Sequence, residues 1–201
     1  MEGEGSPISE EDLKKEICKT IRRLFNRRLI SCLGGNVSAR LPGHSEFWVT
    51  PSGLFKGGLK PRDLVKVNLD CKVIEGSLKP SIETPIHAAI YRRRADVNAI
   101  VHAHNPITTA LTIARVEMRP ITAEAAMIIG EVKVIPWAPP GSEKLANIVG
   151  EYIGGAKALV LMKHGVIGVG SNLFEAEAVA EALEENAMAL LIMSLLKKGA
   201  P

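Results

Sequence analysis

The chain has 201 residues, of which 46% are hydrophobic and 23% are charged, and its formal net charge is +3 at pH 7. This balance is typical of a globular protein with a full core and excludes a largely disordered chain. The small positive charge suits an anionic small molecule, but it is too weak and too dispersed to predict binding to nucleic acid.

The cysteines and the apolar runs predict a cytoplasmic protein. Cys18, Cys32 and Cys71 are widely spaced and odd in number, which indicates neither a disulfide framework nor a thiolate metal site. The longest uncharged apolar run, residues 187–196, has half the length needed to cross a bilayer, and the acidic N-terminus is unlike a signal peptide. We expect no membrane partner and one domain over residues 1–201, with residues 1–8 as a flexible N-terminus.

The first third of the chain predicts a helix followed by two hairpins. Residues 9–12 have the form of a capping box, and apolar residues then recur at helical spacing to about Arg28. A glycine turn leads into a hairpin with strands at 37–41 and 46–50. Glycine and proline predict a loop over 51–61, and alternating apolar residues predict a second hairpin over 63–76.

The rest of the chain predicts helices and strands in turn. Thr84 as cap and Pro85 at the first position indicate a helix that runs to about Arg94. The following elements are expected in this order: a strand at 97–104, helices at 106–115 and 122–129, a strand at 132–136, a helix at 142–152, strands at 158–163 and 166–170, and a helix from 172 to just before 199. The chain has more predicted strands than a simple βαβ alternation would give. We therefore predict an α/β fold with three layers, α/β/α, around a mixed, mostly antiparallel central sheet.

Two histidines end the strand predicted at 97–104. Side chains alternate between the faces of a strand, so Ile100, His102 and His104 share one face. Imidazoles about 7 Å apart along a face can converge on one object. Two ligands do not make a metal site, and a polar strand end explains this pair equally well.

A third histidine and a glutamate extend the pattern. His164 ends an apolar strand beside Gly165, and three neutral imidazoles with an open fourth position form a catalytic type of zinc site. Glu83 directly precedes a helix, where a carboxylate is able to act as a fourth ligand and as a base. On local evidence alone, a turn histidine and a helix-capping glutamate are the simpler interpretations. The remaining histidines, His44 and His87, are predicted in a loop and in a helix, and neither is expected to affect metal content.

Two loops and a serine offer donors for an anion. The stretches GGNVS (34–38) and TPSG (50–53) combine accessible backbone N–H groups with an amide and hydroxyls, and Ser81 adds a further hydroxyl. Groups of this kind bind phosphate. Each stretch taken alone is also compatible with an ordinary turn.

Five motifs together resemble one family. GGNVSAR, VTPSG, KPSIETPIH, IVHAHNP and MKHGVIGVG, in this order and spacing, are similar to the class II aldolase/adducin family over about residues 9–197, and within it to the aldolases of L-fuculose 1-phosphate. The resemblance implies one Zn²⁺ per chain, or another divalent metal, on His102, His104 and His164, with Glu83 as the catalytic acid and base. It also implies a homotetramer. The residues that it implies for binding the substrate phosphate are Gly35, Asn36, Ser52, Gly53 and Ser81.

The resemblance further implies cleavage of a phosphorylated ketose of the fuculose 1-phosphate type. The products would be dihydroxyacetone phosphate and a small aldehyde such as L-lactaldehyde. A ribulose-phosphate 4-epimerase and a methylthioribulose-1-phosphate dehydratase are alternatives on the same metal site. A non-catalytic, adducin-like interaction domain is the alternative of a different class, and the three histidines with the glutamate argue against it.

The chain departs from the family pattern in three places. Ile82 and Leu33 stand where the fuculose phosphate aldolases have a serine and a threonine in the phosphate site, and residues 121–130 lack their tyrosine. Tyr91 and Tyr152, the only tyrosines, lie in predicted helices, where we expect them to be packing residues. The motifs therefore support the metal chemistry more strongly than they support one particular aldehyde.

Overall fold

Eight strands form one mixed sheet in the computed structural model, which describes residues 8–199. Their order across the sheet is β4-β3-β2-β1-β5-β8-β7-β6. Every neighbouring pair is antiparallel except β6 and β7, so the predicted mixed, mostly antiparallel sheet is confirmed. The strands are β1 (Asn36–Ala39), β2 (Phe47–Val49), β3 (Val65–Val67), β4 (Val73–Glu75), β5 (Ala99–Ala103), β6 (Val132–Ile135), β7 (Ala158–Leu161) and β8 (Gly165–Gly170).

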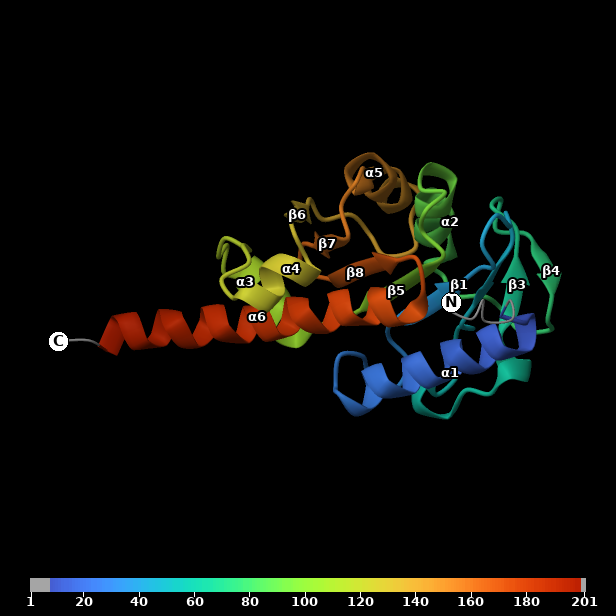
Figure 1. Cartoon of the computed structure of the whole chain (residues 1–201), viewed down its shortest axis with the longest axis horizontal. Helices are drawn as coiled ribbons and strands as arrows, with labels where there is room; N and C mark the ends of the chain where they lie inside the picture. Colours follow the sequence, from blue (N-terminus) through green and yellow to red (C-terminus); the bar gives the residue numbers. More distant parts are fainter. Residues whose placement is uncertain (1–7, 200–201) are drawn as a thin grey trace, which may run out of the picture.

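Helices cover both faces of this sheet and complete the predicted three layers (Figure 1). The helices α2 and α5 lie on one face, while α1 and α6 lie on the other, with α3 and α4 packed against α6. Each face has its own apolar core, because side chains of a strand alternate between the two faces. The helices are α1 (Glu10–Asn26), α2 (Thr84–Arg93), α3 (Pro106–Ile113), α4 (Ala123–Ile128), α5 (Glu143–Ile153) and α6 (Leu173–Gly199).

The predicted elements are present, with two local corrections. The expected loop at 51–61 contains a short 3₁₀ helix, η1 (Lys56–Gly58), and a second one, η2 (Pro61–Asp63), begins at its end. The residue at the N-cap position of α2 is Glu83 and not Thr84, which is the first helical residue, and no side chain makes a capping hydrogen bond there. The cap of α1 agrees with the prediction, since the Ser9 hydroxyl accepts a hydrogen bond from the Asp12 amide at 3.1 Å. The predicted flexible N-terminus lies outside the described residues except for Ile8.

The central strands bring distant motifs onto one face of the sheet. In the pair β1–β5, Asn36 lies opposite His102 and Ser38 lies opposite Ile100. In the pair β5–β8, His102 lies opposite Ile167. Directly opposed residues share a face, and Ile100 and Ile167 belong to the core beneath α2 and α5. Asn36, Ser38 and His102 therefore lie on the α2 side of the sheet.

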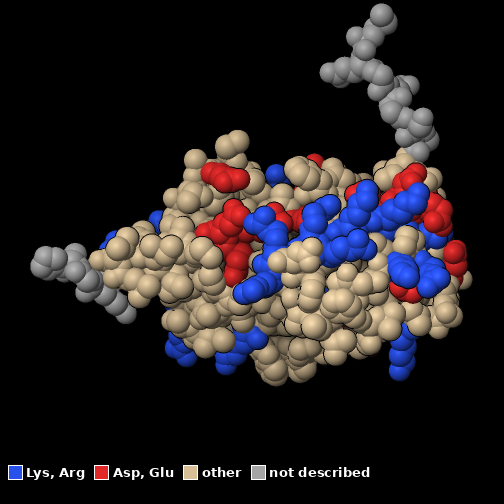
Figure 2. All heavy atoms as spheres, turned by 90° about the horizontal axis from the view of Figure 1, so that it is seen from below, with Lys and Arg blue, Asp and Glu red and all other residues tan. Residues whose placement is uncertain are grey.

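The surface over α1 carries many charged side chains. Figure 2 shows a band of basic side chains across this face, with acidic side chains beside it. Several of these charges are paired, as in Lys19 of α1 with Glu16 at 2.6 Å and Arg27, which follows α1, with Glu185 of α6 at 2.7 Å. No helix within residues 8–199 is both long enough and apolar enough to span a membrane.

The contact between β8 and α6 requires a glycine at position 168. A Cβ atom at Gly168 would overlap the carbonyl oxygen of Ala176 and lie 3.1 Å from the amide nitrogen of Ala180, both in the backbone of α6. We expect Gly168→Ala to lower the free energy of unfolding by about 2 kcal/mol, as overpacking does. In a chain of this size, this loss lowers Tm by about 4–8 °C in a thermal unfolding experiment.

Gly155→Ala is the matched control for this prediction. A Cβ atom there would meet no other atom within 4 Å, so we expect its Tm to stay at the wild-type value. A Gly168→Ala protein that unfolds at the wild-type temperature would contradict the proposed close packing of β8 on α6.

Candidate metal centre

Four of the predicted site residues meet at one end of the central strands. Glu83 directly precedes α2, His102 lies in β5, His104 follows this strand, and His164 lies in the turn between β7 and β8. Each offers one ligand atom, and these atoms all lie within 4.8 Å of one another. Segments far apart in the sequence thus supply a single cluster of three imidazoles and one carboxylate.

The carboxylate of Glu83 is directed at the histidines. Its Oε2 lies 2.9 Å from Nε2 of His102, and its Oε1 lies 3.3 Å from Nε2 of His164. Oε2 also accepts a hydrogen bond from Nδ2 of Asn36 at 3.1 Å. Although Glu83 occupies the cap position of α2, its side chain makes no capping hydrogen bond. The simpler interpretation as a helix-capping glutamate is therefore wrong.

The imidazole contacts test whether the cluster fits a metal ion. Nδ1 of His102 lies 2.9 Å from the carbonyl oxygen of Val166, to which it donates, so in the neutral ring Nε2 of His102 carries the lone pair. This nitrogen faces the Glu83 carboxylate, and Nε2 of His104 lies 3.2 Å from Nε2 of His102. A proton can bridge only one pair of these nitrogen and oxygen atoms, whereas a divalent cation can bind all of the ligand atoms at once. The backbone contact of His102 is also the type that orients metal-binding histidines.

Burial and charge hold most of the cluster in the protonation states that metal ligands need. Burial lowers the pKa of His104 to about 3 and that of His164 to about 4, and the neighbouring His102 contributes to both shifts. For Glu83, burial alone would raise the pKa, but the histidines and Asn36 outweigh it and hold the pKa below its usual value. Burial likewise lowers the pKa of His102, but Glu83 outweighs it and raises the pKa. Neutral imidazoles and a carboxylate are the metal-binding forms.

Two glycines leave room for His104. A Cβ atom at Gly34 would lie 2.7 Å from Nδ1 of His104. At Gly165, directly after His164, a Cβ atom would overlap the carbonyl oxygen of Ala103 and lie 3.1 Å from the Cα of His104. Larger residues at either position would displace the His104 ring or the end of β5.

The predicted phosphate-binding residues lie around Glu83. Residues 50–52 pair with 79–81, because the Ser52 amide donates to Lys79 at 2.9 Å and the Ser81 amide donates to Thr50 at 3.2 Å. This pairing places the TPSG loop beside the segment that ends at Glu83. Gly35 and Gly53 both have positive φ, at 76° and 74°, which glycine adopts without strain.

The residues that depart from the family pattern are exposed beside these segments. Ile82, the neighbour of Glu83, has 66% of its surface exposed, and Leu33 has 63% exposed. Both present an apolar side chain to solvent where the family pattern has a hydroxyl. The anion donors of this chain are therefore fewer than the family pattern predicts.

Two polar residues near the site had no predicted role. Lys56 is buried in η1 and donates a hydrogen bond to the carbonyl oxygen of Pro51, which braces the TPSG loop, and burial lowers its pKa to about 8. His87 is fully buried and contacts Asn36 and Ser38. Its spacing of four residues from Glu83, one helical turn, is a sequence signal that it faces the same way.

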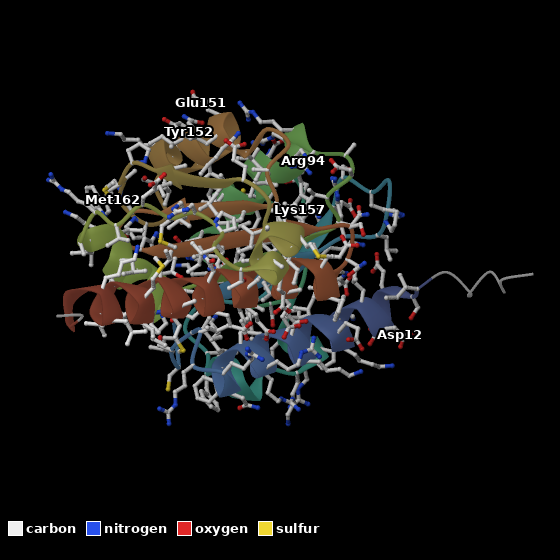
Figure 3. All side chains as sticks on the ribbon, turned by 60° about the vertical axis from the view of Figure 1, so that its left-hand side comes forward. Asp12, Arg94, Glu151, Tyr152, Lys157 and Met162 are labelled. Atoms are coloured by element: carbon white, nitrogen blue, oxygen red, sulfur yellow. The ribbon has the colours of Figure 1, made fainter. Side chains whose placement is uncertain are left out.

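The two tyrosines differ in their surroundings. Tyr91 is buried in α2 and agrees with the prediction of a packing residue. Tyr152 does not, because 41% of its surface is exposed. It lies at the rim of the molecule beside Glu151, as Figure 3 shows. The reason is its position on α5, where Val149 and Ile153 take the buried face instead.

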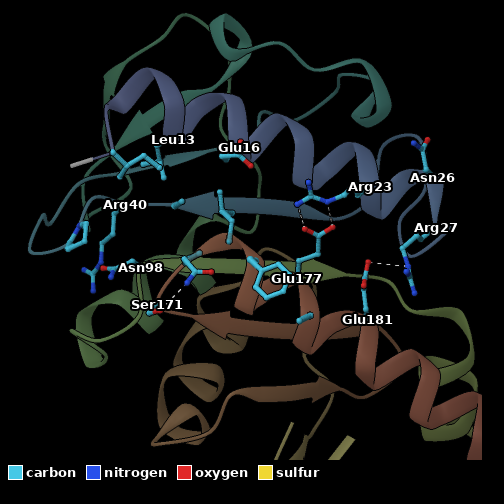
Figure 4. A pocket seen from close by; sticks show the side chains of 18 residues that line it. Leu13, Glu16, Arg23, Asn26, Arg27, Arg40, Asn98, Ser171, Glu177 and Glu181 are labelled. Carbon is cyan, nitrogen blue, oxygen red and sulfur yellow. Dashed lines mark hydrogen bonds and ion pairs between the residues drawn. The ribbon is translucent and has the colours of Figure 1, made fainter. Parts of the chain in front are cut away.

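A separate groove lies between α1 and α6, away from the cluster. It encloses about 860 Å³, and none of its lining residues is a member of the metal-binding group. Figure 4 shows the ion pairs that cross it, from Arg23 to Glu177 and from Arg27 to Glu181. These pairs engage four of the six charged side chains that line the groove, while Glu16 pairs with Lys19 and Arg40 donates to backbone carbonyl oxygens.

Comparison with known proteins identifies the family. The class II aldolase and adducin N-terminal domain family matches residues 15–191. The chain belongs to this family. This class II aldolase is 35% identical to an L-fuculose phosphate aldolase of Methanocaldococcus jannaschii, over 92% of this chain and 99% of the relative.

Two further relatives carry the names of a decarboxylase and of an aldolase. A 3-oxo-tetronate 4-phosphate decarboxylase of Escherichia coli strain K12 is 32% identical, over 92% of this chain and 88% of the relative. The crystal structure of L-fuculose-1-phosphate aldolase from Thermus thermophilus superposes with a TM-score of 0.85 at 32% identity, over 94% of this chain and 97% of the other. The chain is thus a lyase with the donor set for a divalent metal.

Proposed function

We propose that this class II aldolase is a zinc enzyme that cleaves L-fuculose 1-phosphate, or a closely similar phosphorylated ketose, to dihydroxyacetone phosphate and L-lactaldehyde. The observation that carries the proposal is the contact of the Glu83 carboxylate with two imidazoles beside a loop rich in anion donors. A base, a metal-binding set and an anion site are the three parts that this cleavage needs. The similarity to fuculose phosphate aldolases supports the choice of sugar.

In this reaction, the side chains of the cluster divide into two roles. His102, His104 and His164 would hold the zinc ion, which supplies Lewis acidity to a ketone and its neighbouring hydroxyl when bound. Glu83 would move the proton: as the carbon–carbon bond breaks, the hydroxyl on the carbon that becomes the aldehyde loses its proton, and Glu83 takes up one proton and passes it to the carbon that lost its bond. In the condensation direction, Glu83 removes that proton from the carbon and a proton returns to the new hydroxyl. Its fixed carboxylate needs no reorientation for this step.

The phosphate group would lie against the predicted anion residues. The donors would be the Ser81 hydroxyl, the second N–H of the Asn36 amide and the backbone N–H groups around Gly35 and Gly53. The Ser52 hydroxyl donates to the carbonyl oxygen of Pro80 at 3.0 Å and would join them by turning from that oxygen to the phosphate. One N–H of Asn36 is already donated to Glu83. A single side chain would then contact both the phosphate and the base, which fixes the distance between the phosphate and the reacting carbon.

A substrate panel tests this proposal. We expect the purified, zinc-loaded enzyme to convert L-fuculose 1-phosphate into equal amounts of dihydroxyacetone phosphate and L-lactaldehyde. We also expect kcat/KM for unphosphorylated L-fuculose to be lower by at least about 100-fold, because each hydrogen bond to a charged group contributes roughly 1.5–3 kcal/mol. Both products and both sugars are measured in one coupled assay series.

Ile82→Ser serves as the matched variant in this panel. Restoring one hydroxyl should lower KM for the phosphorylated sugar by about tenfold and leave the unphosphorylated sugar unchanged. Formation of an epimer, a dehydrated ketone or carbon dioxide without a triose phosphate would contradict aldol cleavage. It would instead indicate an epimerase, a dehydratase or a decarboxylase on the same site, and the decarboxylase relative makes the last of these a required member of the panel.

The homotetramer and the cytoplasmic location implied for the chain stay predictions. The C-terminal half of α6 carries exposed apolar side chains, among them Ile192, Leu195 and Leu196, which a partner copy would cover. This surface supports an assembly of several chains.

A further inference from the structure

A continuous line of buried polar side chains runs from Glu83 into the core beneath α2. Asn36 contacts Glu83 on one side, and its Oδ1 lies 2.5 Å from Nε2 of His87 on the other. Nδ1 of His87 lies 2.6 Å from the Ser38 hydroxyl, which lies 2.8 Å from the Tyr91 hydroxyl. All of these residues are buried, so each polar group depends on its neighbour in the line for its hydrogen bonds.

The inventory of donors and acceptors allows only one direction for these bonds. The Asn36 amide donates to Glu83 through Nδ2, so its Oδ1 is an acceptor and Nε2 of His87 must donate to it. Burial lowers the pKa of His87 to about 3, so the ring is neutral and its Nδ1 is an acceptor. The Ser38 hydroxyl then gives its only proton to His87, and Tyr91 must donate to Ser38.

The orientation of the Asn36 amide depends on this direction of the hydrogen bonds, from Tyr91 through Ser38 and His87 to Asn36. Rotation of the amide by half a turn would place Oδ1 against the Glu83 carboxylate, where two acceptors repel each other. It would also place the NH₂ group against the donor of His87, where two donors meet. With His87 as the Nε2–H tautomer, only the observed orientation has every pair matched.

We propose that His87 is a positioning residue for the reaction, acting through Asn36 on the carboxylate of Glu83. This inference rests on the proposed catalytic role of Glu83. His87 holds the NH₂ end of Asn36 toward the site, where one N–H fixes Oε2 of Glu83 and the other is free to meet the phosphate. Ser38 and Tyr91 hold His87 in the tautomer that this requires. Polar networks of this kind restrict buried groups to one arrangement when all members are satisfied.

The test compares two replacements of His87. In His87→Gln, the amide NH₂ group occupies the place of Nε2–H and can still donate to Asn36, whereas His87→Leu has a similar volume and no donor. We expect His87→Leu to lower kcat by about 10- to 100-fold, the effect of one hydrogen bond to a charged group. His87→Gln should recover most of the wild-type kcat. Zinc content should stay at the wild-type level in both, since His87 is not a ligand.

A double substitution shows whether the effect passes through Glu83. In a Glu83→Gln background, His87→Leu should lower kcat by less than about twofold, because the base that it positions is already gone. An undiminished effect in that background would overturn the proposal, as would a wild-type kcat in the single His87→Leu protein.

The tautomer of His87 can be measured without any activity. Two-bond ¹⁵N–¹H correlation spectra of the ¹⁵N-histidine protein should show a protonated Nε2 and an unprotonated Nδ1 at His87, with or without zinc. A protonated Nδ1 would overturn the proposal even if His87→Leu failed to fold. Failure of the proposed function is distinguishable, because it would appear as normal turnover in Glu83→Gln while this spectrum stays as expected.

Discussion

His164→Ala is expected to remove most of the bound zinc. A catalytic zinc site has three protein ligands and one open position, so the loss of one imidazole leaves too few donors for tight binding. We expect about one zinc per chain in the wild-type protein and a small fraction of this in His164→Ala, measured by elemental analysis after dialysis. The same loss is expected for replacements of His102 and His104, whose ring nitrogens lie in the same cluster.

His44→Ala is the control for zinc content. His44 is exposed and lies outside the group of ligand atoms, so its replacement should leave zinc unchanged. Undiminished zinc in His164→Ala would refute the assignment of the three histidines, whatever the activity of that protein.

Glu83→Gln is expected to lower turnover by about 10²–10⁴, which is the usual contribution of a positioned acid–base group. The substitution keeps the shape of the side chain, so its oxygen can still accept the hydrogen bond from Asn36. The three imidazoles remain, and zinc should largely stay bound. The measurements are kcat for the phosphorylated ketose and zinc content of the same preparation.

Glu75→Gln is the matched control for Glu83→Gln. Glu75 is an exposed carboxylate on β4, outside the cluster, so its replacement should leave kcat unchanged. Turnover close to wild type in Glu83→Gln, with zinc intact, would show that its carboxylate is not the base.

The tertiary structure corrected the predictions made from sequence for side chains whose partners come from another part of the chain. The sequence could not show that Glu83 turns away from the end of α2, because its partners lie on β5 and in the β7–β8 turn. The same holds for His87, which was predicted only as a helical residue. Its contacts, Asn36 and Ser38, precede it by 51 and 49 residues.

The sequence by itself determined the helices and strands, the three-layer class and the identity of the histidines at the strand ends, because alternation, helical spacing and caps are local properties of the chain. Only the tertiary structure decided that β1, β5 and β8 lie side by side, with Asn36 opposite His102. Strand order depends on burying both faces of the sheet at once, and this free energy belongs to the whole fold. The direction of the Asn36 amide has the same origin, since it is set by a line of hydrogen bonds that exists only once α2 has packed on β1.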